Sequence, residues 1–413
     1  MALYAHIIGE SSLQLWGLTS RDRLTRMLER MEVEHVIDDC SLLPPDATLL
    51  IIHCNYLYDV RVLTHLMEQE NVVFQLAVKG KDVPIAAHVQ ARFITLALQA
   101  LEHEISPVSG PLQLIGLHAF TNTFHKKLRK VDPAYVFAIT QENQDALEEH
   151  LYSGSYKGIT DLITKWAWPI PAKWVTQLCA RHGIRPNAVT FLGLILTIIS
   201  GVCFAKQQYL IGLLAGWGMT FLDTVDGKLA RVTVTSSWFG NIFDHGIDVI
   251  HPPLWYLAWG IGLTTFQPTT WWPWSLTTTL WAIFIGYVMG RVIEGSFHQL
   301  VGRFGIYCWK PIDSYFRLIT ARRNPNLILL TGSAIIARPD WGLMGVALWT
   351  VASTGILFVR FVMALGTKKR CGEVRPWLAD IGTSIDRDSL TARLFTRPPF
   401  TKTMPSKDYG GSQ

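Results

Sequence analysis

The stretch FLDTVDGKLARVTVTSSWFGNIFDHGIDVI, residues 221–250, decides the fold of the larger part of the chain. It places four aspartates in a segment that is otherwise apolar enough to lie in or against a membrane. Asp223 and Asp226 are three residues apart, so on a helix they share one face with the small residues Gly227 and Ala230. The first half of the stretch therefore predicts a helix with two carboxylates beside an open surface.

The second half of the stretch predicts a matching helix. Gly240, Asp244 and Asp248 follow one another at intervals of four residues, which places them on one helical face. Lys228 and Arg231 cannot balance four acids, and unneutralised carboxylates at the edge of a bilayer are costly. We therefore expect divalent cations, and all-oxygen ligation favours Mg²⁺, Mn²⁺ or Ca²⁺ over zinc. Because metal pairs about 4 Å apart serve displacement at phosphorus, the pattern predicts carboxylates that hold metal against a diphosphate.

The composition of the whole chain is that of a membrane protein. Its 413 residues are 49% hydrophobic, and its mean hydropathy is positive. The formal net charge of +5 is too small to indicate a nucleic-acid partner. The six cysteines form no CxxC pair or metal spacing, so we expect reduced thiols. The start, MALYAHIIGESS, lacks the features of a cleaved signal, so the first spanning helix is expected to direct targeting.

The first part of the chain, residues 1–155, has the pattern of a separate α/β domain. YAHIIGE, VEHVID and ATLLIIHCN resemble buried strands, whereas SRDRLTRMLERM and VRVLTHLMEQ show apolar residues at helical spacing. Residues 156–186 mix Trp, Ile and Leu with Lys and Arg, which indicates an amphipathic segment in the membrane interface; a plain connecting helix is the alternative.

Residues 187–365 predict an all-α transmembrane domain, because apolar runs long enough to cross a bilayer recur along them. The loop at 264–273 is rich in Trp and lacks Lys and Arg, whereas the loop at 293–325 is basic and therefore cytoplasmic. Residues 366–413 form a cytosolic tail that is expected to be partly disordered, from about residue 385 onward. The six predicted spans are 187–206, 209–224, 241–263, 274–292, 326–338 and 341–364.

The eight-residue pattern D-x2-D-G-x2-A-R-x8-G-x3-D-x3-D resembles the signature of the CDP-alcohol phosphotransferase family. It is matched at every position by Asp223, Asp226, Gly227, Ala230, Arg231, Gly240, Asp244 and Asp248. The resemblance extends over residues 156–365, because family members have six spans and an interfacial helix, and RPNAVT at 185–190 is similar to their entry to the first span.

This resemblance implies a site and a reaction. Asp223, Asp226 and Asp244 would bind two Mg²⁺ or Mn²⁺ ions, and Asp248 would bind metal or act as the base. The resemblance also implies that the donor is a CDP-linked molecule and that CMP leaves. The nucleotide-binding residues that it implies are Asn187, Gly227, Ala230, Arg231 and Gly240.

The N-terminal domain is similar to the sugar-phosphate nucleotidyltransferase domain that is fused to such membrane domains in bifunctional enzymes. Those enzymes need a glycine-rich loop for the nucleotide triphosphate. Here IIGESSLQLWGL offers only Gly9 and Gly17, and Asn55 stands where an aspartate would bind metal, although Asp59 is near. We therefore expect an inactive relative with a docking or regulatory role, with an active cytidylyltransferase as the alternative.

Arginines near the later spans suggest the nature of the acceptor. A cation inside a span is costly and usually faces a partner or an aqueous cavity, and guanidinium groups bind phosphate with two hydrogen bonds. Family members with phosphorylated acceptors place arginines in this way. We therefore expect a phosphorylated alcohol as acceptor, bound by Arg360 and one of Arg291, Arg322 or Arg323.

The leading function is transfer of phosphatidyl from CDP-diacylglycerol to a polar alcohol in phospholipid synthesis. Transfer of a phospho-headgroup from a CDP-alcohol to a lipid or polyol-phosphate acceptor is the first alternative, since the same aspartates serve both. An inactive membrane scaffold is the alternative of another class. We expect a homodimer in the inner or plasma membrane, with the N-terminal domain and the site facing the cytoplasm and membrane lipid as a partner.

Overall fold

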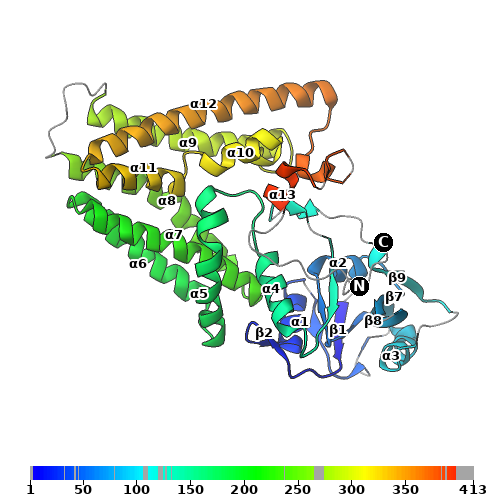
Figure 1. Ribbon diagram of the computed structural model, residues 1–413. Helices are drawn as coiled ribbons and strands as arrows, with labels where there is room; N and C mark the ends of the chain where they lie inside the picture. The colour runs from blue at the N-terminus through cyan, green and yellow to red at the C-terminus, as the bar shows by residue number, and fades with distance from the viewer. Residues whose placement is uncertain are drawn as a thin grey trace.

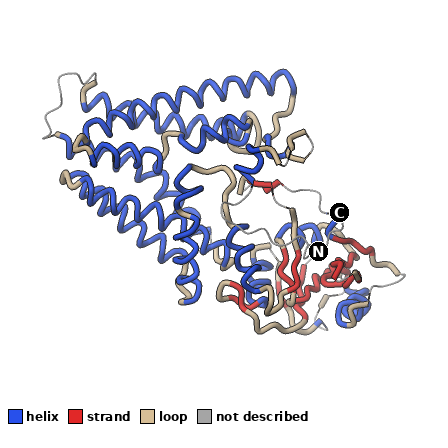
Figure 2. Tube along the Cα trace, in the orientation of Figure 1, coloured by secondary structure: helices blue, strands red, loops and turns tan. Residues whose placement is uncertain are grey.

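The computed structural model separates into a bundle of long helices and a domain that contains a β-sheet (Figures 1 and 2). A cavity lies where the two parts meet. The structure describes residues 3–31, 33–40, 43–44, 46–78, 80–105, 110–119, 124–125, 128–131, 133–236, 238–264, 274–382, 384–386 and 388–396, without the side chains of 118, 124, 125, 239, 241 and 244.

The N-terminal domain is built on a mixed sheet, as its alternating pattern predicts. Strand β1 pairs in parallel with β4 and β5, β8 pairs antiparallel with β5 and β7, and β9 is parallel to β7. In sheet order the strands are β4 (His35–Val36), β1 (Leu3–Ile8), β5 (Thr48–His53), β8 (Lys81–Gln90), β7 (Val72–Val78) and β9 (Gln113–Gly116).

Helices cover both faces of this sheet. On one face α1 (Ser20–Glu29) and α2 (Val60–Met67) bury Leu24, Leu28 and Leu66 against the strands. On the other face α3 (Ile94–Glu102) packs through Ala97 and Leu101. The four-residue spacings between these apolar positions are the helical period that the sequence shows. The predicted α/β character of this region is therefore confirmed.

Smaller elements connect the sheet to the bundle. The hairpin of β2 (Gln14–Leu15) and β3 (Leu18–Thr19) precedes α1, and β6 (Tyr56–Tyr58) pairs with β12 (Val136–Ala138). The pair β10 (Phe124–His125) and β11 (Lys130–Val131) follows β9, and α4 (Gln144–Gly154) leads towards the bundle.

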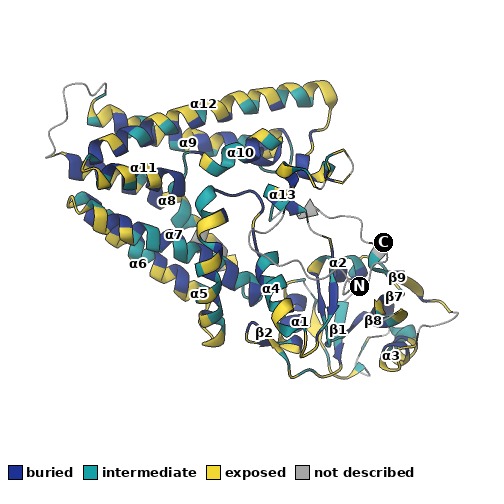
Figure 3. Cartoon of the chain, in the orientation of Figure 1, coloured by how far each residue is buried: buried dark blue, intermediate teal, exposed yellow. Residues whose placement is uncertain are grey.

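The helical bundle coincides with the six predicted spans. Three of its helices, α6, α9 and α12, are long and apolar enough to cross a membrane, so the count of six spans stays a prediction. Large apolar side chains such as Leu214 and Ile335 are exposed. Figure 3 shows exposed positions along the helices of the bundle. The helices are α6 (Pro186–Ala205), α7 (Tyr209–Val232), α8 (Trp238–Leu263), α9 (Leu276–Leu300), α11 (Arg323–Ile335) and α12 (Pro339–Cys371).

Two shorter helices flank this bundle. Helix α5 (Pro169–Arg181) lies in the predicted interfacial segment, and it exposes Ile170, Trp174 and Leu178, which are spaced four residues apart along one face. Helix α10 (Pro311–Ile319) lies between α9 and α11, in the loop that the sequence predicts to be cytoplasmic. Its first helical residue is proline, which needs no hydrogen-bond partner there.

The C-terminal tail is more ordered than the sequence predicts. Residues 390–396 form helix α13 (Leu390–Thr396), and Ala392 and Phe395 are fully buried. They pack with Trp377 and Leu378 against the bundle. The expectation of disorder from about residue 385 is therefore wrong for this helix, because two apolar side chains in a polar segment are enough to anchor it. Residues 397–413 lie outside the described part of the chain.

Gly158 marks the point where three distant segments meet. A Cβ atom at this position would lie 2.4 Å from the carbonyl oxygen of Arg129 and 2.5 Å from that of Phe395. No side chain fits between these two carbonyls, so glycine is required here. The segment before α5, the strand pair β10–β11 and the C-terminal helix α13 are thereby joined directly under the bundle.

Candidate active site

The predicted carboxylates line a cavity of about 440 Å³ between the bundle and the N-terminal domain. Asp223 and Asp226 come from α7 and Asp248 comes from α8. Asp244 also lies on α8, but its side chain is outside the described residues. Of the other predicted site residues, the cavity is lined by Asn187, Gly227, Ala230, Arg231, Gly240, Arg291, Arg322 and Arg323.

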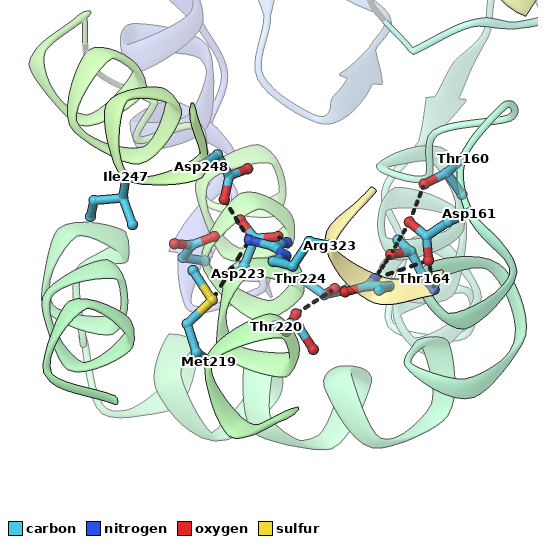
Figure 4. A network of polar contacts seen from close by, with 12 residues as sticks. Thr160, Asp161, Thr164, Met219, Thr220, Asp223, Thr224, Ile247, Asp248 and Arg323 are labelled. Atoms are coloured by element: carbon cyan, nitrogen blue, oxygen red, sulfur yellow. Dashed lines mark hydrogen bonds and ion pairs between the residues drawn. The ribbon is translucent and has the colours of Figure 1, made fainter. Parts of the chain in front are cut away.

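Arg323 connects the two acidic helices. Its Nη1 donates to Oδ1 of Asp248 at 2.5 Å, and its Nη2 donates to Oδ2 of Asp223 (Figure 4). Arg323 is the first residue of α11, so the start of that helix places a guanidinium group between Asp223 and Asp248. One guanidinium thus bridges two carboxylates, and it fixes the positions of α7, α8 and α11 relative to one another.

Asp226 is held in a different way. It is buried, and its Oδ2 accepts a hydrogen bond of 2.6 Å from Thr190 on α6. Thr190 belongs to the predicted entry segment RPNAVT, and its neighbour Asn187 also lines the cavity. The aspartate pattern and the RPNAVT segment therefore meet at this cavity, through a contact that the sequence does not reveal.

Small residues keep one side of the cavity open. A Cβ atom at Gly227 would lie 3.2 Å from Nη2 of Arg231, so the arginine side chain folds back over the glycine. Ala230 and Gly240 line the same cavity. Ala230 on α7 and Gly240 on α8 therefore leave space for a ligand in the cavity, whereas Gly227 is covered by the Arg231 side chain.

Several cations also line the cavity. Arg322 pairs with Glu294, which also accepts from Arg291 Nη2 at 3.1 Å and from Tyr307 at 2.9 Å. Arg317 of α10 reaches the same cavity, and its Nε and Nη1 are buried with no hydrogen-bond acceptor among the described residues. These arginines therefore suit an anionic ligand, which would complete the bonding of Arg317.

Arg360 is not brought to this cavity. Its Nε and Nη2 donate to the two carboxylate oxygens of Asp313 at 2.6 and 2.9 Å, and its guanidinium lies 4.3 Å from the ring centre of Trp309. An arginine within a span requires a partner, and for Arg360 that partner is the Asp313 carboxylate of α10. The expectation that Arg360 binds the acceptor is not supported by its position.

Asp161 is a buried residue of the site that the sequence analysis missed. It accepts from the backbone and hydroxyl of Thr164 at 3.0 and 2.9 Å, and from Nδ2 of Asn324 at 2.9 Å (Figure 4). Burial acts to raise the pKa of Asp161, but Arg317 and these hydrogen bonds outweigh it and lower the pKa below its ordinary value. Through Asn324, Asp161 therefore fixes the start of α11, where Arg322 and Arg323 lie.

The donor set fits a hard divalent cation. Asp223, Asp226 and Asp248 offer carboxylate oxygens to one cavity, and such oxygens are the usual ligands of Mg²⁺ and Mn²⁺. Among the described side chains, no group of three or more acids, histidines or cysteines is already drawn together as a metal cluster. A cation would compete with Arg323 for the same two carboxylates.

Comparison with known proteins gives the class of the helical domain. Residues 184–300 match the family described as CDP-alcohol phosphatidyltransferase. This segment contains α6 to α9 and the whole aspartate pattern. The match supports a CDP-alcohol phosphatidyltransferase domain in this chain, and the family is one of transferases.

Individual relatives agree with this family. Over 115 residues the chain is 35% identical to cholinephosphotransferase 1 of Gallus gallus and 32% identical to that of Xenopus laevis, in each case over 25% of this chain. Over 79 residues, 19% of this chain, it is 38% identical to archaetidylinositol phosphate synthase of Pyrococcus horikoshii. The matched segments cover 33%, 27% and 42% of these relatives, respectively.

Proposed function

We propose that this chain is an integral membrane transferase that moves a phosphatidyl group from CDP-diacylglycerol to a phosphorylated polar alcohol and releases CMP. The observation that carries the proposal is that one cavity is lined by both carboxylates and cations. Asp223, Asp226 and Asp248 line it together with Arg317 and Arg322. A diphosphate donor held through metal and an anionic acceptor need this arrangement.

The proposed roles follow from where each side chain lies. Gly227, Ala230 and Gly240 would accommodate the cytidine nucleotide, and Asn187 lines the same cavity. Asp223 and Asp226, with Asp244 on sequence grounds, would hold two Mg²⁺ or Mn²⁺ ions. Bound cations would offset the negative charge of the diphosphate and of the departing CMP.

Asp248 is proposed as the general base. The acceptor hydroxyl attacks the phosphorus of the phosphatidyl group, the bond from that phosphorus to the CMP oxygen breaks, and the hydroxyl proton passes to the Asp248 carboxylate. Arg323 holds Asp248 at 2.5 Å, so it orients the base. Arg317, Arg322 and Arg291 would hold the acceptor phosphate. No covalent enzyme intermediate is needed.

A second direction of transfer is favoured by a specific observation, the similarity to proteins named as cholinephosphotransferases. In that direction a CDP-alcohol gives its phospho-headgroup to a lipid alcohol. The same carboxylates would serve, but the acceptor would carry no phosphate. The buried, incompletely bonded Arg317 is then without a role, which is why we place this direction second.

The N-terminal domain is proposed to be an inactive relative of a nucleotidyltransferase. Gly9 follows β1, and a Cβ atom there would lie 2.6 Å from Cε1 of His53, so the imidazole fills the space at this strand end. Asp59 caps α2 by accepting from the backbone of Arg61 at 2.9 Å and pairs with its guanidinium. The space beside Gly9 and the carboxylate of Asp59 are thus both occupied by contacts within the domain. A nucleotide site would need them to be available to the ligand.

The test of the proposal is an acceptor panel with purified full-length protein in lipid vesicles. CDP-diacylglycerol and Mg²⁺ are supplied with phosphorylated polyols, with the matching unphosphorylated polyols, and with diacylglycerol plus CDP-choline. We expect CMP release only with the phosphorylated acceptors. CMP release from CDP-choline and diacylglycerol alone would establish the second direction. No CMP release from any pair would favour an inactive scaffold.

A further inference from the structure

The loop between α7 and α8 is held by a row of arginines from the N-terminal domain. On α1, Arg23 and Arg26 are three residues apart, and Arg30 caps the same helix. Their guanidinium groups donate to the backbone carbonyls of Val232, Thr233 and Ser236 at 2.6, 2.8 and 2.7 Å, respectively. Three side chains at helical spacing thus bind three backbone carbonyls within residues 232–236 of the helical bundle.

These carbonyls need such donors. The last turn of a helix has carbonyl groups without helical partners and carries a partial negative charge, which cations nearby stabilise. Val232 is the last residue of α7, the helix that carries Asp223 and Asp226. Arg23 is buried, and burial lowers its pKa to about 10. The arginine row therefore completes the end of the acidic helix from outside the bundle.

The held loop is part of the cavity wall. Thr235 and Ser236 line the cavity together with Ala230 and Arg231. The backbone N–H of Thr235 donates to the carbonyl of Ala230 at 3.0 Å, which turns the chain back over the end of α7. Displacement of this loop would therefore change the wall on the side of the small residues.

The conformation of the loop is strained. Val234 has a φ of +50°, a region that β-branched residues rarely adopt. Its side chain packs against the core of the N-terminal domain, in the cluster that contains Leu24, Met27 and Leu28 of α1. A strained residue persists only where its surroundings hold it, and here those surroundings belong to the other domain.

The β2–β3 hairpin docks beside the same helix end. Trp16 is buried, stacks on Tyr152 at a centroid distance of 5.6 Å, and shares a cluster with Val232. A Cβ atom at Gly17, where φ is +73°, would lie 2.9 Å from the carbonyl oxygen of Ala180 on α5. One of the two glycines of the predicted loop thus allows contact between domains.

We propose that the N-terminal domain is a structural part of the transferase site: its arginine row and core hold residues 233–236 in the strained conformation that forms the cavity wall. Arg26 and Arg30 are positioning residues that act on the site through the loop. The proposed role of the loop in turnover depends on the proposed function, whereas its dependence on the arginines does not.

The test uses full-length protein in lipid vesicles and two readouts. Hydrogen exchange of a peptide that covers residues 230–236 reports the loop, and steady-state CMP release reports the site. In the double variant Arg26→Ala/Arg30→Ala we expect exchange at Val234 and Thr235 to accelerate about tenfold or more. We also expect kcat/KM for the CDP-linked donor to fall about tenfold. Arg26→Lys, which keeps a cationic donor, should recover part of both effects.

Arg21→Ala is the matched control. Arg21 lies on the same helix, but it pairs with Asp38 at 2.7 Å on the exposed surface. It should leave both readouts unchanged. Unchanged loop exchange in the double variant would overturn the proposal, and faster exchange with unchanged kinetics would overturn the role in turnover.

A single Arg30→Ala variant guards against loss of the fold, because this arginine is exposed. Exchange of strands β5 and β8 must stay slow in that variant, while exchange at the loop rises. Two results together would show that the arginine row does not position the loop. The first is a loop that stays protected from exchange in Arg30→Ala. The second is loop exchange that accelerates in the double variant only when exchange of β5 and β8 accelerates as well. If CMP release is absent even from the unaltered protein, the exchange experiment still decides whether the arginine row holds the loop, and the failure lies with the proposed function alone.

Discussion

Asp161 and Asn324 form a hydrogen bond of 2.9 Å that joins the segment before α5 to the first turn of α11. Both residues are buried, and they are 163 positions apart in the chain. Asn324 directly follows Arg322 and Arg323. The aspartate therefore governs where two cations of the cavity stand, although it is outside the aspartate pattern that the sequence reveals.

Replacing Asp161 by Asn should lower kcat for CMP release about tenfold and reduce thermal stability. The neutral amide cannot balance Arg317, and one of its groups is left without a suitable partner, at a cost of about 1–3 kcal/mol. Because the folded-state pKa is depressed, this carboxylate stabilises the protein above its ordinary pKa and the contribution is lost as pH falls through the folded value. Thermal unfolding of both proteins between pH 3 and 7 measures this. If the melting temperatures of the two proteins depend on pH in the same way, the charge of Asp161 does not contribute to stability.

The two carboxylates that share Arg323 should differ in their effects. Asp248→Asn should abolish turnover and leave binding of the CDP-linked donor largely intact, because the base acts on the acceptor. Asp223→Asn should lose metal and donor together. Isothermal titration with a CDP-linked donor, with and without Mg²⁺, separates the cases. Equal loss of donor binding in both variants would make Asp248 primarily a ligand.

Arg317 and Arg360 give a matched pair for the acceptor. Arg317→Gln should raise the KM of a phosphorylated acceptor about tenfold, equivalent to about 1.4 kcal/mol, with donor affinity unchanged. Arg360→Lys should instead lower the melting temperature and leave that KM unchanged, because lysine cannot reproduce the two bonds to Asp313. The opposite result, with Arg360→Lys raising the acceptor KM, would return Arg360 to the site.

Lys165 should give the protein a pH-dependent stability. Its Nζ is buried against the hydroxyl of Tyr156 at 2.6 Å, and burial lowers its pKa from 10.5 to about 8. The unfolded chain binds more protons than the folded protein between these values, so stability should rise as pH increases from about 8 towards 10. Thermal unfolding over this range, with Lys165→Met as comparison, tests the sign. The variant should show a flatter dependence, and an unaltered slope would contradict the assignment.

The N-terminal domain should release no pyrophosphate from CTP with any sugar or polyol phosphate. The reason is the absence of a phosphate-binding glycine loop at the end of β1, where His53 packs on Gly9. A coupled pyrophosphate assay on the full-length Asp248→Asn protein excludes interference from the transferase reaction. Robust release that depends on CTP would show that the domain is an active cytidylyltransferase.

The sequence predicted the secondary structure of both parts and the acidic helices, because these depend on local periodicity. Strands β1, β4 and β5 and helices α1 and α2 lie where their apolar spacing indicates. The bonds of Asp161 and Arg360 could not be predicted in the same way. Each joins elements far apart in the chain, and a charged residue carries no signal that identifies its partner. Arg360 shows this directly, since an arginine within a span predicts a counterion but not that Asp313 supplies it.

The contact at Gly158 has a consequence for how the protein is made. Phe395 belongs to the last described helix, whereas Arg129 and Gly158 lie in the first half of the chain. Domains made early on the ribosome can fold before synthesis ends. This corner cannot close until Phe395 has been synthesised, and Phe395 follows α12, the last helix of the bundle. The junction beneath the cavity is therefore completed only after every helix of the bundle has been made.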